Sequence, residues 1–144
     1  NLWNDAKEYI KEKPWFGYGA GVASNLILDK RGEKFGSSDP HNDYLKIAIE
    51  NGLAGLLAYV SLIVGLFINL IKKYSVATGR TQIQTLILAG LGLSIAFYVM
   101  SAVDNILRNT ALMWSFWALI GAIFAVKSNF LSLRGASATR QSHT

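Results

Sequence analysis

The sequence predicts an all-α integral membrane protein, with three transmembrane helices preceded by an external helical loop region. Its apolar residues are concentrated in uncharged blocks, at 53–71 (19 residues), 81–103 (23 residues) and 109–126 (18 residues). About 20 apolar residues are enough to cross a bilayer core of about 30 Å. The charged residues between 51 and 126 all fall at the ends of these blocks: Lys72, Lys73, Arg80, Asp104 and Arg108. A soluble helix bundle would need a polar face on each helix, and these blocks do not provide one.

Basic residues near the ends of the blocks predict the orientation, because Lys and Arg are retained on the cytoplasmic side of a membrane. One side carries six of them, namely Lys72, Lys73, Arg80, Lys127, Arg134 and Arg140, and the other side carries Lys34, Lys46 and Arg108. Residues 1–52 are therefore predicted to be external. Residues 127–144 are predicted to form a cytoplasmic, disordered tail, since they are small and polar. An external amino-terminal half also predicts that further spans precede this chain in a larger multi-pass protein.

The external region should begin with a short amphipathic helix that ends before Pro14. Apolar residues recur there at helical spacing: Leu2, Trp3, Ala6, Tyr9 and Ile10. The Trp and Tyr side chains suit either the lipid headgroup layer or ordinary packing. Residues 15–21 alternate aromatics with glycines, which predicts a tight structural turn. Residues 22–28 fit either a short strand or a helix.

A second external helix is predicted to follow the polar loop at 29–38. Asp39 is expected to cap it, with Pro40 at the first helical position. The helical spacing would then place four side chains on one face: His41, Tyr44, Leu45 and Ala48. Gly52 marks a break or bend before the first apolar block.

The composition excludes several functional classes. The net charge of +5 comes from the loop between the first two blocks and from the tail, so it is a topology signal. Nucleic-acid binding would need a basic face with interleaved aromatics. The absence of cysteine excludes disulfides and thiolate zinc sites, and two histidines offer little for a transition-metal site. We therefore expect no nucleic-acid partner, no metal and no cofactor.

Several motifs resemble those of the O-antigen ligase and polymerase family of bacterial membrane glycosyltransferases. The motifs are Pro14, Gly17-Tyr18-Gly19, His41-Asn42-Asp43-Tyr44-Leu45, Glu50-Asn51-Gly52-Leu53-Ala54-Gly55, Asp104, and Phe116-Trp117-Ala118-Leu119-Ile120-Gly121. The resemblance covers most of the chain but only the carboxy-terminal part of a family member. It implies a multi-pass enzyme of the bacterial cytoplasmic (inner) membrane, which takes a glycan from an undecaprenyl diphosphate carrier at the outer face.

The resemblance also implies an acceptor and a division of roles. Ligases pass the glycan to a glycolipid, the lipid A core, and related polymerases join repeat units to a glycan. A histidine of the large external loop is the proposed general base of this family, and His41 matches it. Arginines hold the carrier diphosphate without a required metal. The family arginine that precedes the Leu-Trp segment would lie before Asn1. This chain alone is expected to be inactive, because the spans that form the rest of the carrier site are expected to precede it.

The candidate site residues suit this chemistry on physical grounds. Transfer from a diphosphate-linked sugar needs a base for the incoming hydroxyl, and imidazole titrates near neutral pH. At a helix start, the partial positive charge should disfavour a second proton on the His41 ring. Arg31 and Arg108 are the external candidates to stabilise the leaving diphosphate. Asn42 and Tyr44 are predicted to orient the substrate or the histidine.

Other interpretations of these residues stay open at this point. His41 could be a capping or surface histidine, and either arginine could be a solvated charge. Asp104 and Arg108, four residues apart, could pair with each other, and Tyr44 could anchor the chain at the membrane interface. For the whole protein, the alternatives are a repeat-unit polymerase, a membrane scaffold, and a transporter or transport accessory protein. A transporter would want charges along its spans, and the three blocks hold none.

Overall fold

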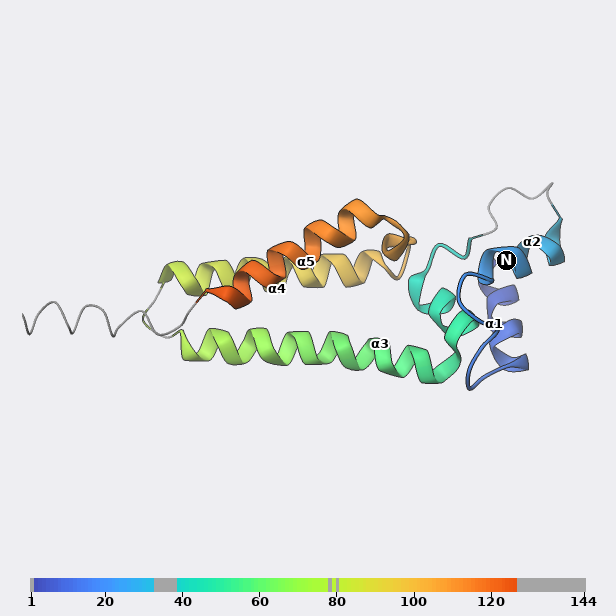
Figure 1. Ribbon diagram of the computed structural model, residues 1–144, viewed down its shortest axis with the longest axis horizontal. Coiled ribbons are helices and arrows are strands. Elements are labelled where there is room, and N and C mark those ends of the chain that lie inside the picture. Colours follow the sequence, from blue (N-terminus) through green and yellow to red (C-terminus); the bar gives the residue numbers. More distant parts are fainter. Residues whose placement is uncertain (1, 33–38, 78, 80, 127–144) are drawn as a thin grey trace, which may run out of the picture.

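The computed structural model describes residues 2–32, 39–77, 79 and 81–126, and all regular structure within them is helical (Figure 1). The elements are α1 (Leu2–Glu12), α2 (Ala23–Arg31), α3 (Asp43–Val76), α4 (Thr81–Met100), the 3₁₀ helix η2 (Ile106–Arg108) and α5 (Thr110–Ala125). The predicted all-α class is confirmed, and the segment left open at 22–28 is helical. The predicted tail at 127–144 and the loop residues 33–38 lie outside the described residues.

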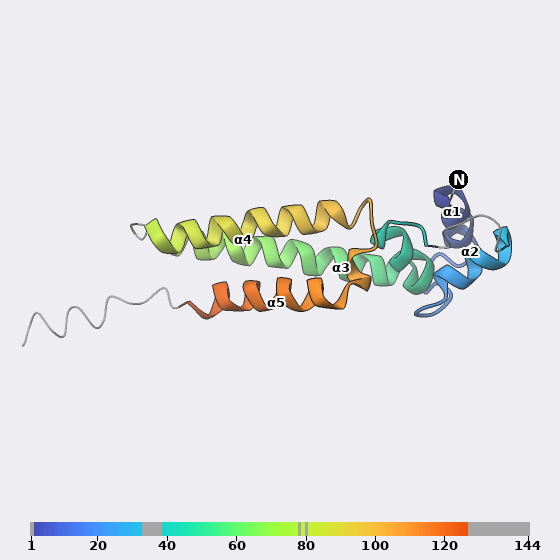
Figure 2. The ribbon, with the colours of Figure 1, turned by 90° about the horizontal axis from the view of Figure 1, so that it is seen from above.

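Helices α3, α4 and α5 lie side by side along the long axis, and α1 and α2 pack at one end of this bundle (Figures 1 and 2). The bundle core combines aliphatic with aromatic side chains, and within it the ring of Phe97 stacks on that of Phe116 with centroids 4.2 Å apart. A second, smaller core joins α1 and α2 to the beginning of α3. Its buried residues are Ala6, Ala23, Ile27 and Ile49.

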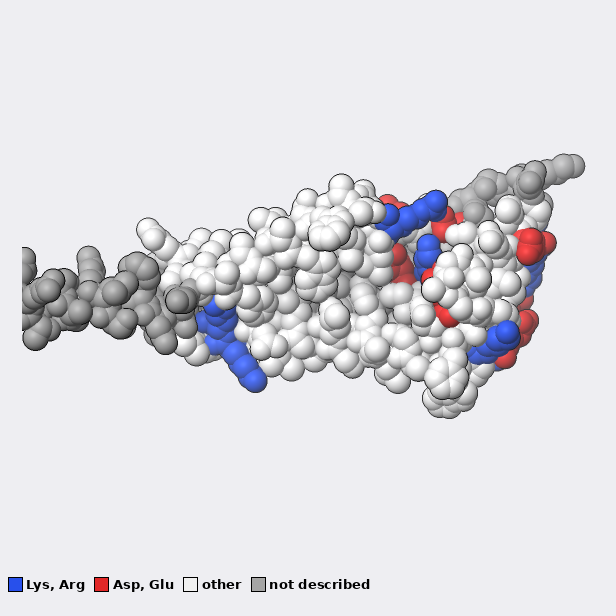
Figure 3. All heavy atoms as spheres, in the orientation of Figure 1, with Lys and Arg blue, Asp and Glu red and all other residues white. Residues whose placement is uncertain are grey.

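The outer surface of the three-helix bundle is apolar. Large apolar side chains stay exposed on all three helices, among them Leu57, Leu62, Ile71, Leu88, Ile95, Val99, Leu119 and Phe124. On the face shown in Figure 3, charged side chains gather at the two ends, with Asp and Glu only at the α1/α2 end, and the surface between the ends carries none. Water would not solvate such a surface, whereas lipid would. Together with the lengths of the helices, this surface indicates a membrane protein.

Two of the three predicted spans have helices long enough to cross a bilayer, α3 with 34 residues and α4 with 20. Helix α5 has 16 residues. At 1.5 Å per residue it is about 24 Å long, which is less than a bilayer core of about 30 Å. A third complete span is therefore not confirmed. The orientation of the bundle in the membrane stays a prediction.

Helix α3 is kinked at Gly52, whose backbone angles (φ 65°, ψ −165°) are not helical. This confirms the predicted break before the first apolar block. A kink leaves carbonyls on one side and amides on the other without helical partners. Residues 14–19, which we call the strap, cross the kink and supply the missing hydrogen-bond partners. The hydrogen bonds run from Tyr18 N to Ile49 O (2.9 Å), Gly19 N to Glu50 O (2.8 Å), Leu53 N to Pro14 O (2.7 Å) and Ala54 N to Trp15 O (3.1 Å).

Two glycines make this crossing possible. A Cβ atom on Gly52 would lie 2.3 Å from the carbonyl carbon of Trp15, and one on Gly17 would lie 2.4 Å from the carbonyl oxygen of Ile49. Both glycines have positive φ, 65° and 66°. The run predicted as a tight turn is thus a strap that completes the backbone of α3.

The predicted start of the second external helix is wrong. Asn42, and not Asp39, is the N-cap of α3, because its side-chain oxygen accepts from Leu45 N at 3.0 Å. His41 precedes the helix with φ 46°, so it does not share a helical face with the residues that follow. The physical reason is tertiary, since the Asp39 carboxylate binds Arg108 and the hydroxyl of Ser24. The second apolar block also ends earlier than predicted, because α4 stops at Met100.

Candidate active site at the His41 pocket

An open surface pocket of about 310 Å³ lies where the turn before α3 faces the connection between α4 and α5. Its lining is polar and comes from residues far apart in the chain: Asp39, His41, Asp104, Asn105, Arg108 and Asn109. The pocket therefore lies at the α1/α2 end of the bundle. It brings together two of the predicted site residues, His41 and Arg108.

His41 faces Asp104 across this pocket. The imidazole Nδ1 lies 3.4 Å from Asp104 Oδ1, and about half of each side chain is exposed. The left-handed backbone of His41 (φ 46°) is uncommon for a residue other than glycine, although histidine tolerates it better than most. In the tautomer that donates Nδ1–H to the carboxylate, Nε2 carries the lone pair that can accept a proton.

Asp104 is held in place by the backbone that follows it. The amide of Asn105 donates to Asp104 Oδ1 at 2.7 Å. This amide, and next the hydrogen bond with His41, hold the pKa of the Asp104 carboxyl below its usual range. The group is therefore a carboxylate at neutral pH. An ionised carboxylate behind an imidazole orients the ring and stabilises the imidazolium that forms when it takes a proton.

Arg108 pairs with Asp39 and not with Asp104. The predicted Asp104–Arg108 alternative assumed helical spacing, but residues 101–103 form a turn, residues 104–105 are not helical and residues 106–108 form a 3₁₀ helix. Asp39 also lies 3.8 Å from the ammonium nitrogen of Lys46 and accepts from the hydroxyl of Ser24. The Arg108 side chain is largely exposed, and the mostly buried carboxylate of Asp39 holds its guanidinium at the edge of the pocket.

The start of α3 is tied directly to the α4–α5 connection. The buried Asp43 carboxylate, 1% exposed, accepts from Leu107 N at 3.1 Å, and Asp43 N donates to Ser101 O at 2.8 Å. Asn42 Nδ2 donates to Ala102 O at 2.8 Å. These contacts fix the loop that carries Asp104 opposite the turn that carries His41, although the two residues are 63 positions apart.

The structure does not bring the other predicted site residues into the pocket lining. Arg31 binds Asp5 through Nε, linking α2 to α1, and this hydrogen bond lowers the pKa of Asp5 despite partial burial. Asn42 uses its oxygen as the helix cap and its nitrogen for the α4–α5 connection. The Tyr44 hydroxyl donates to Tyr98 O at 2.9 Å. The contacts of these three residues hold the fold together.

Sequence reasoning missed Asp39, Asn105 and Asn109 as lining residues, and it assigned Asp104 no role toward His41. One signal was available, because Asn105 and Asn109 lie with Asp104 and Arg108 in the short segment 104–109, at the junction of the second and third apolar blocks. Polar residues at the end of a span often line a site. Among the described residues, no group of three or more His, Cys, Asp or Glu side chains could hold a metal ion.

Comparisons with known proteins agree with the motifs. Residues 1–60 match the family model described as O-antigen ligase. Two curated proteins, each named "Putative polysaccharide ligase", are similar over 139 residues, with 27% identity in Rickettsia typhi and 25% in Rickettsia prowazekii. Each alignment covers 90% of this chain and 32% of the relative, so the chain spans about a third of the length of these relatives. The matched segment contains both the strap and His41, so the chain is similar to the O-antigen ligase family in the segment that crosses the kink of α3 and supplies the pocket histidine.

Proposed function

We propose that the protein is a glycosyltransferase of the bacterial cytoplasmic membrane, which transfers a glycan from an undecaprenyl diphosphate carrier to a sugar hydroxyl. One observation carries this proposal: His41, its partner Asp104 and the cation Arg108 line the same pocket. A base and a cation side by side are what transfer from a diphosphate requires. In this proposal residues 1–52 are external, so the pocket opens at the outer face of the membrane.

The proposed reaction uses His41 as the general base. The acceptor hydroxyl gives its proton to Nε2 while its oxygen attacks the anomeric carbon of the donor sugar. The bond between that carbon and the diphosphate oxygen breaks, and the configuration inverts. The new imidazolium then faces the Asp104 carboxylate, 3.4 Å from Nδ1. Asp104 favours the productive tautomer before the transfer and stabilises the positive ring after it.

Arg108 is proposed to stabilise the negative charge of the leaving diphosphate. A guanidinium presents a planar fork of donors that matches phosphate oxygens. In the unliganded pocket this fork is turned to Asp39, which also binds Ser24 and lies near Lys46. The donor would have to compete with that carboxylate for Arg108. The residues that complete the donor site would come from spans outside this chain.

The test is transfer of carrier-linked glycan by membranes that contain the full-length protein with His41→Ala. We expect transfer to be lost at unchanged protein level, and His143→Ala, the change to the chain's other histidine, to retain it. Full transfer by His41→Ala would remove His41 from the mechanism. Supplying lipid A core or glycan repeat units as the acceptor separates a ligase from a polymerase.

Arg108 is tested separately through the donor. Arg108→Ala should raise the KM for the carrier-linked glycan or lower the transfer rate, and Arg108→Lys should restore part of the loss because it keeps the charge without the fork. Equal kinetics for all three proteins would show that Arg108 does not contact the diphosphate. His41→Ala would still be inactive in that case, so the two roles are separable.

A further inference from the structure

Two aromatic side chains of the strap, Trp15 and Phe16, are largely exposed on the surface of the described residues. Phe16 is 81% exposed, more than any other exposed large apolar side chain of the described residues, and Trp15 is 66% exposed. Exposed tryptophan and phenylalanine side by side are unfavourable in water. They do not contribute to the reaction proposed above.

The position of these aromatics along α3 is fixed by backbone hydrogen bonds. Pro14 O accepts from Leu53 N, and Trp15 O accepts from Ala54 N. Leu53 is the first residue of the uncharged block at 53–71. Trp15 therefore lies level with the first turn of the apolar part of α3, where the hydrocarbon of a bilayer would begin. Tryptophan concentrates at this depth in membrane proteins, because its ring suits the boundary between headgroups and acyl chains.

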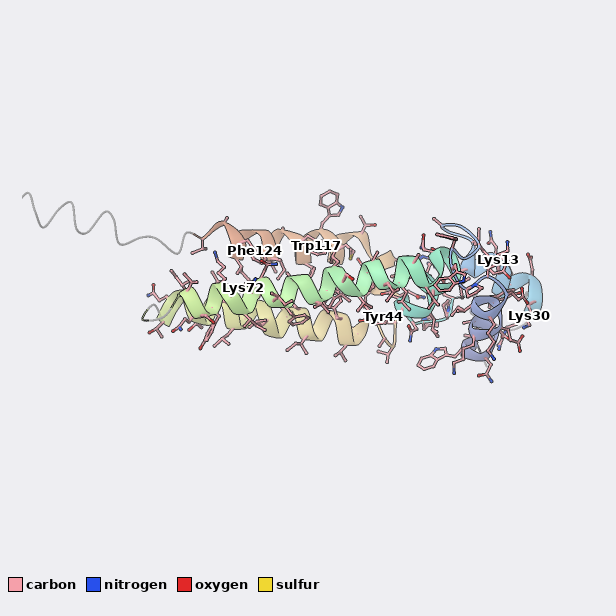
Figure 4. All side chains as sticks on the ribbon, turned by 90° about the horizontal axis from the view of Figure 1, so that it is seen from below. Lys13, Lys30, Tyr44, Lys72, Trp117 and Phe124 are labelled. Carbon is pink, nitrogen blue, oxygen red and sulfur yellow. The ribbon has the colours of Figure 1, made fainter. Side chains whose placement is uncertain are left out.

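The neighbouring surface fits the same boundary. Apolar side chains of α3 continue from this level, with Leu53 and Leu57 both exposed. On the other side, the ammonium of Lys13 lies 4.4 Å from the centroid of the Tyr18 ring and is at the α1/α2 end of the molecule (Figure 4). A lysine beside interfacial aromatics can reach lipid phosphates. Along the long axis of the bundle, the side chains around the strap thus change from charged to aromatic and then to aliphatic.

We propose that Trp15 and Phe16 insert into the headgroup–acyl boundary of the leaflet at the α1/α2 end, as a rigid membrane anchor. The occupant of this exposed patch is lipid, because the patch is continuous with the lipid-facing surface of α3. Rigidity comes from the four strap hydrogen bonds and the Gly17–Gly52 crossing. The inference concerns membrane contact alone, so it stands whether or not His41 acts as a base.

Tryptophan quenching in the full-length protein, reconstituted in phosphatidylcholine vesicles, tests this proposal. The emission of Trp15 is obtained as the difference between the wild type and Trp15→Phe. We expect lipids brominated near the top of the acyl chain to remove most of this difference emission, and lipids brominated near the chain end to remove less. The matched control is Trp3→Phe, because the Trp3 indole donates to Pro40 O at 3.0 Å and its difference emission should be quenched less.

Two results would overturn the proposal. Quenching of the Trp15 emission by aqueous iodide, with none by brominated lipid, would place the side chain in water. Emission that neither reagent quenches would mean that other spans of the protein cover it. If Trp15→Phe does not fold, Phe16→Trp adds an indole at the neighbouring position, and its added emission should respond to the same brominated lipids.

Discussion

Replacing Gly52 with alanine should unfold the junction between the strap and α3. The backbone at Gly52 (φ 65°, ψ −165°) belongs to a region that is essentially restricted to glycine, so a side chain there is strained by about 1–3 kcal/mol. The added Cβ would also lie 2.3 Å and 2.4 Å from the carbonyl carbon and oxygen of Trp15, which are backbone atoms and cannot rotate away. The strap must therefore move and weaken its hydrogen bonds, each worth about 1 kcal/mol.

These terms add to at least about 3 kcal/mol, if two of the four hydrogen bonds weaken. At roughly 2–4 °C per kcal/mol, the apparent melting temperature should fall by roughly 6–12 °C. The measurement is the loss of the monodisperse peak in size-exclusion chromatography after heating the detergent-solubilised protein. Gly65→Ala is the matched control, because Gly65 lies in the same helix, a Cβ there meets nothing within 4 Å, and alanine is the better helix former.

A melting temperature of Gly52→Ala equal to that of Gly65→Ala would refute this reasoning. A double-mutant cycle makes the test stricter. Gly17→Ala displaces the same strap from the other side, since its Cβ would lie 2.4 Å from Ile49 O. Once either change has displaced the strap, the second has little left to disrupt, so the double variant should lose clearly less than the sum of the single losses. Strict additivity would mean that the two glycines do not share one contact.

Three further predictions concern the site and its supports. Asp104→Asn should remove most transfer activity, because the amide no longer favours one tautomer of His41, and full activity of this variant would contradict the role of Asp104. In the wild type the pKa of Asp104 is lowered, so the transfer rate between about pH 5 and 8 should show no change caused by titration of this carboxylate. Arg31→Ala should lower the melting temperature by roughly 2–4 °C, for about 1 kcal/mol, without changing the donor KM. The ion pair of Arg31 with Asp5 stabilises the fold fully above pH 3.8, the ordinary pKa of Asp5, and this contribution is lost as the pH falls through the lowered pKa. The difference in melting temperature between wild type and Arg31→Ala should therefore shrink on acidification. A constant difference would argue against the pair. Asn42→Ala should destabilise the protein by about 1–2 kcal/mol in thermal unfolding. Asn42→Ser should destabilise it by less, because both variants lose the hydrogen bond to Ala102 O but the serine hydroxyl can still cap α3. Equal losses would rule out the cap.

Much of the fold follows from local sequence signals. The uncharged blocks predict α3 and α4 because spanning a bilayer needs little beyond length and apolar composition. Pro14 ends α1 within two residues of its observed end at Glu12, and Gly52 breaks α3 as predicted. Helix α5 is shorter than its block by one residue at each end, because Asn109 and Val126 are its caps.

The parts that sequence could not predict depend on contacts between distant segments. Asp39 and Asn42 are equally good caps in isolation. Which of them caps α3 was decided by Arg108, a residue 69 positions away that binds Asp39. The pairing of His41 with Asp104 has the same origin, because these residues are 63 positions apart and meet only when the α4–α5 connection packs against the turn before α3. Gly17 and Gly52 were visible as glycines, but their mutual contact was not.

The loop between α2 and the turn at His41 is fixed where it begins and where it ends. Arg31 is tied to α1 through Asp5, and Asn42 is tied to the end of α4 through Ala102. The entropy of closing a loop grows only slowly with its length, so added residues between Gly32 and Asp39 should leave both attachment points in place. We expect relatives to vary most in length there. Such insertions would change the surface next to Asp39, which lines the pocket, without altering the contacts that hold the pocket together.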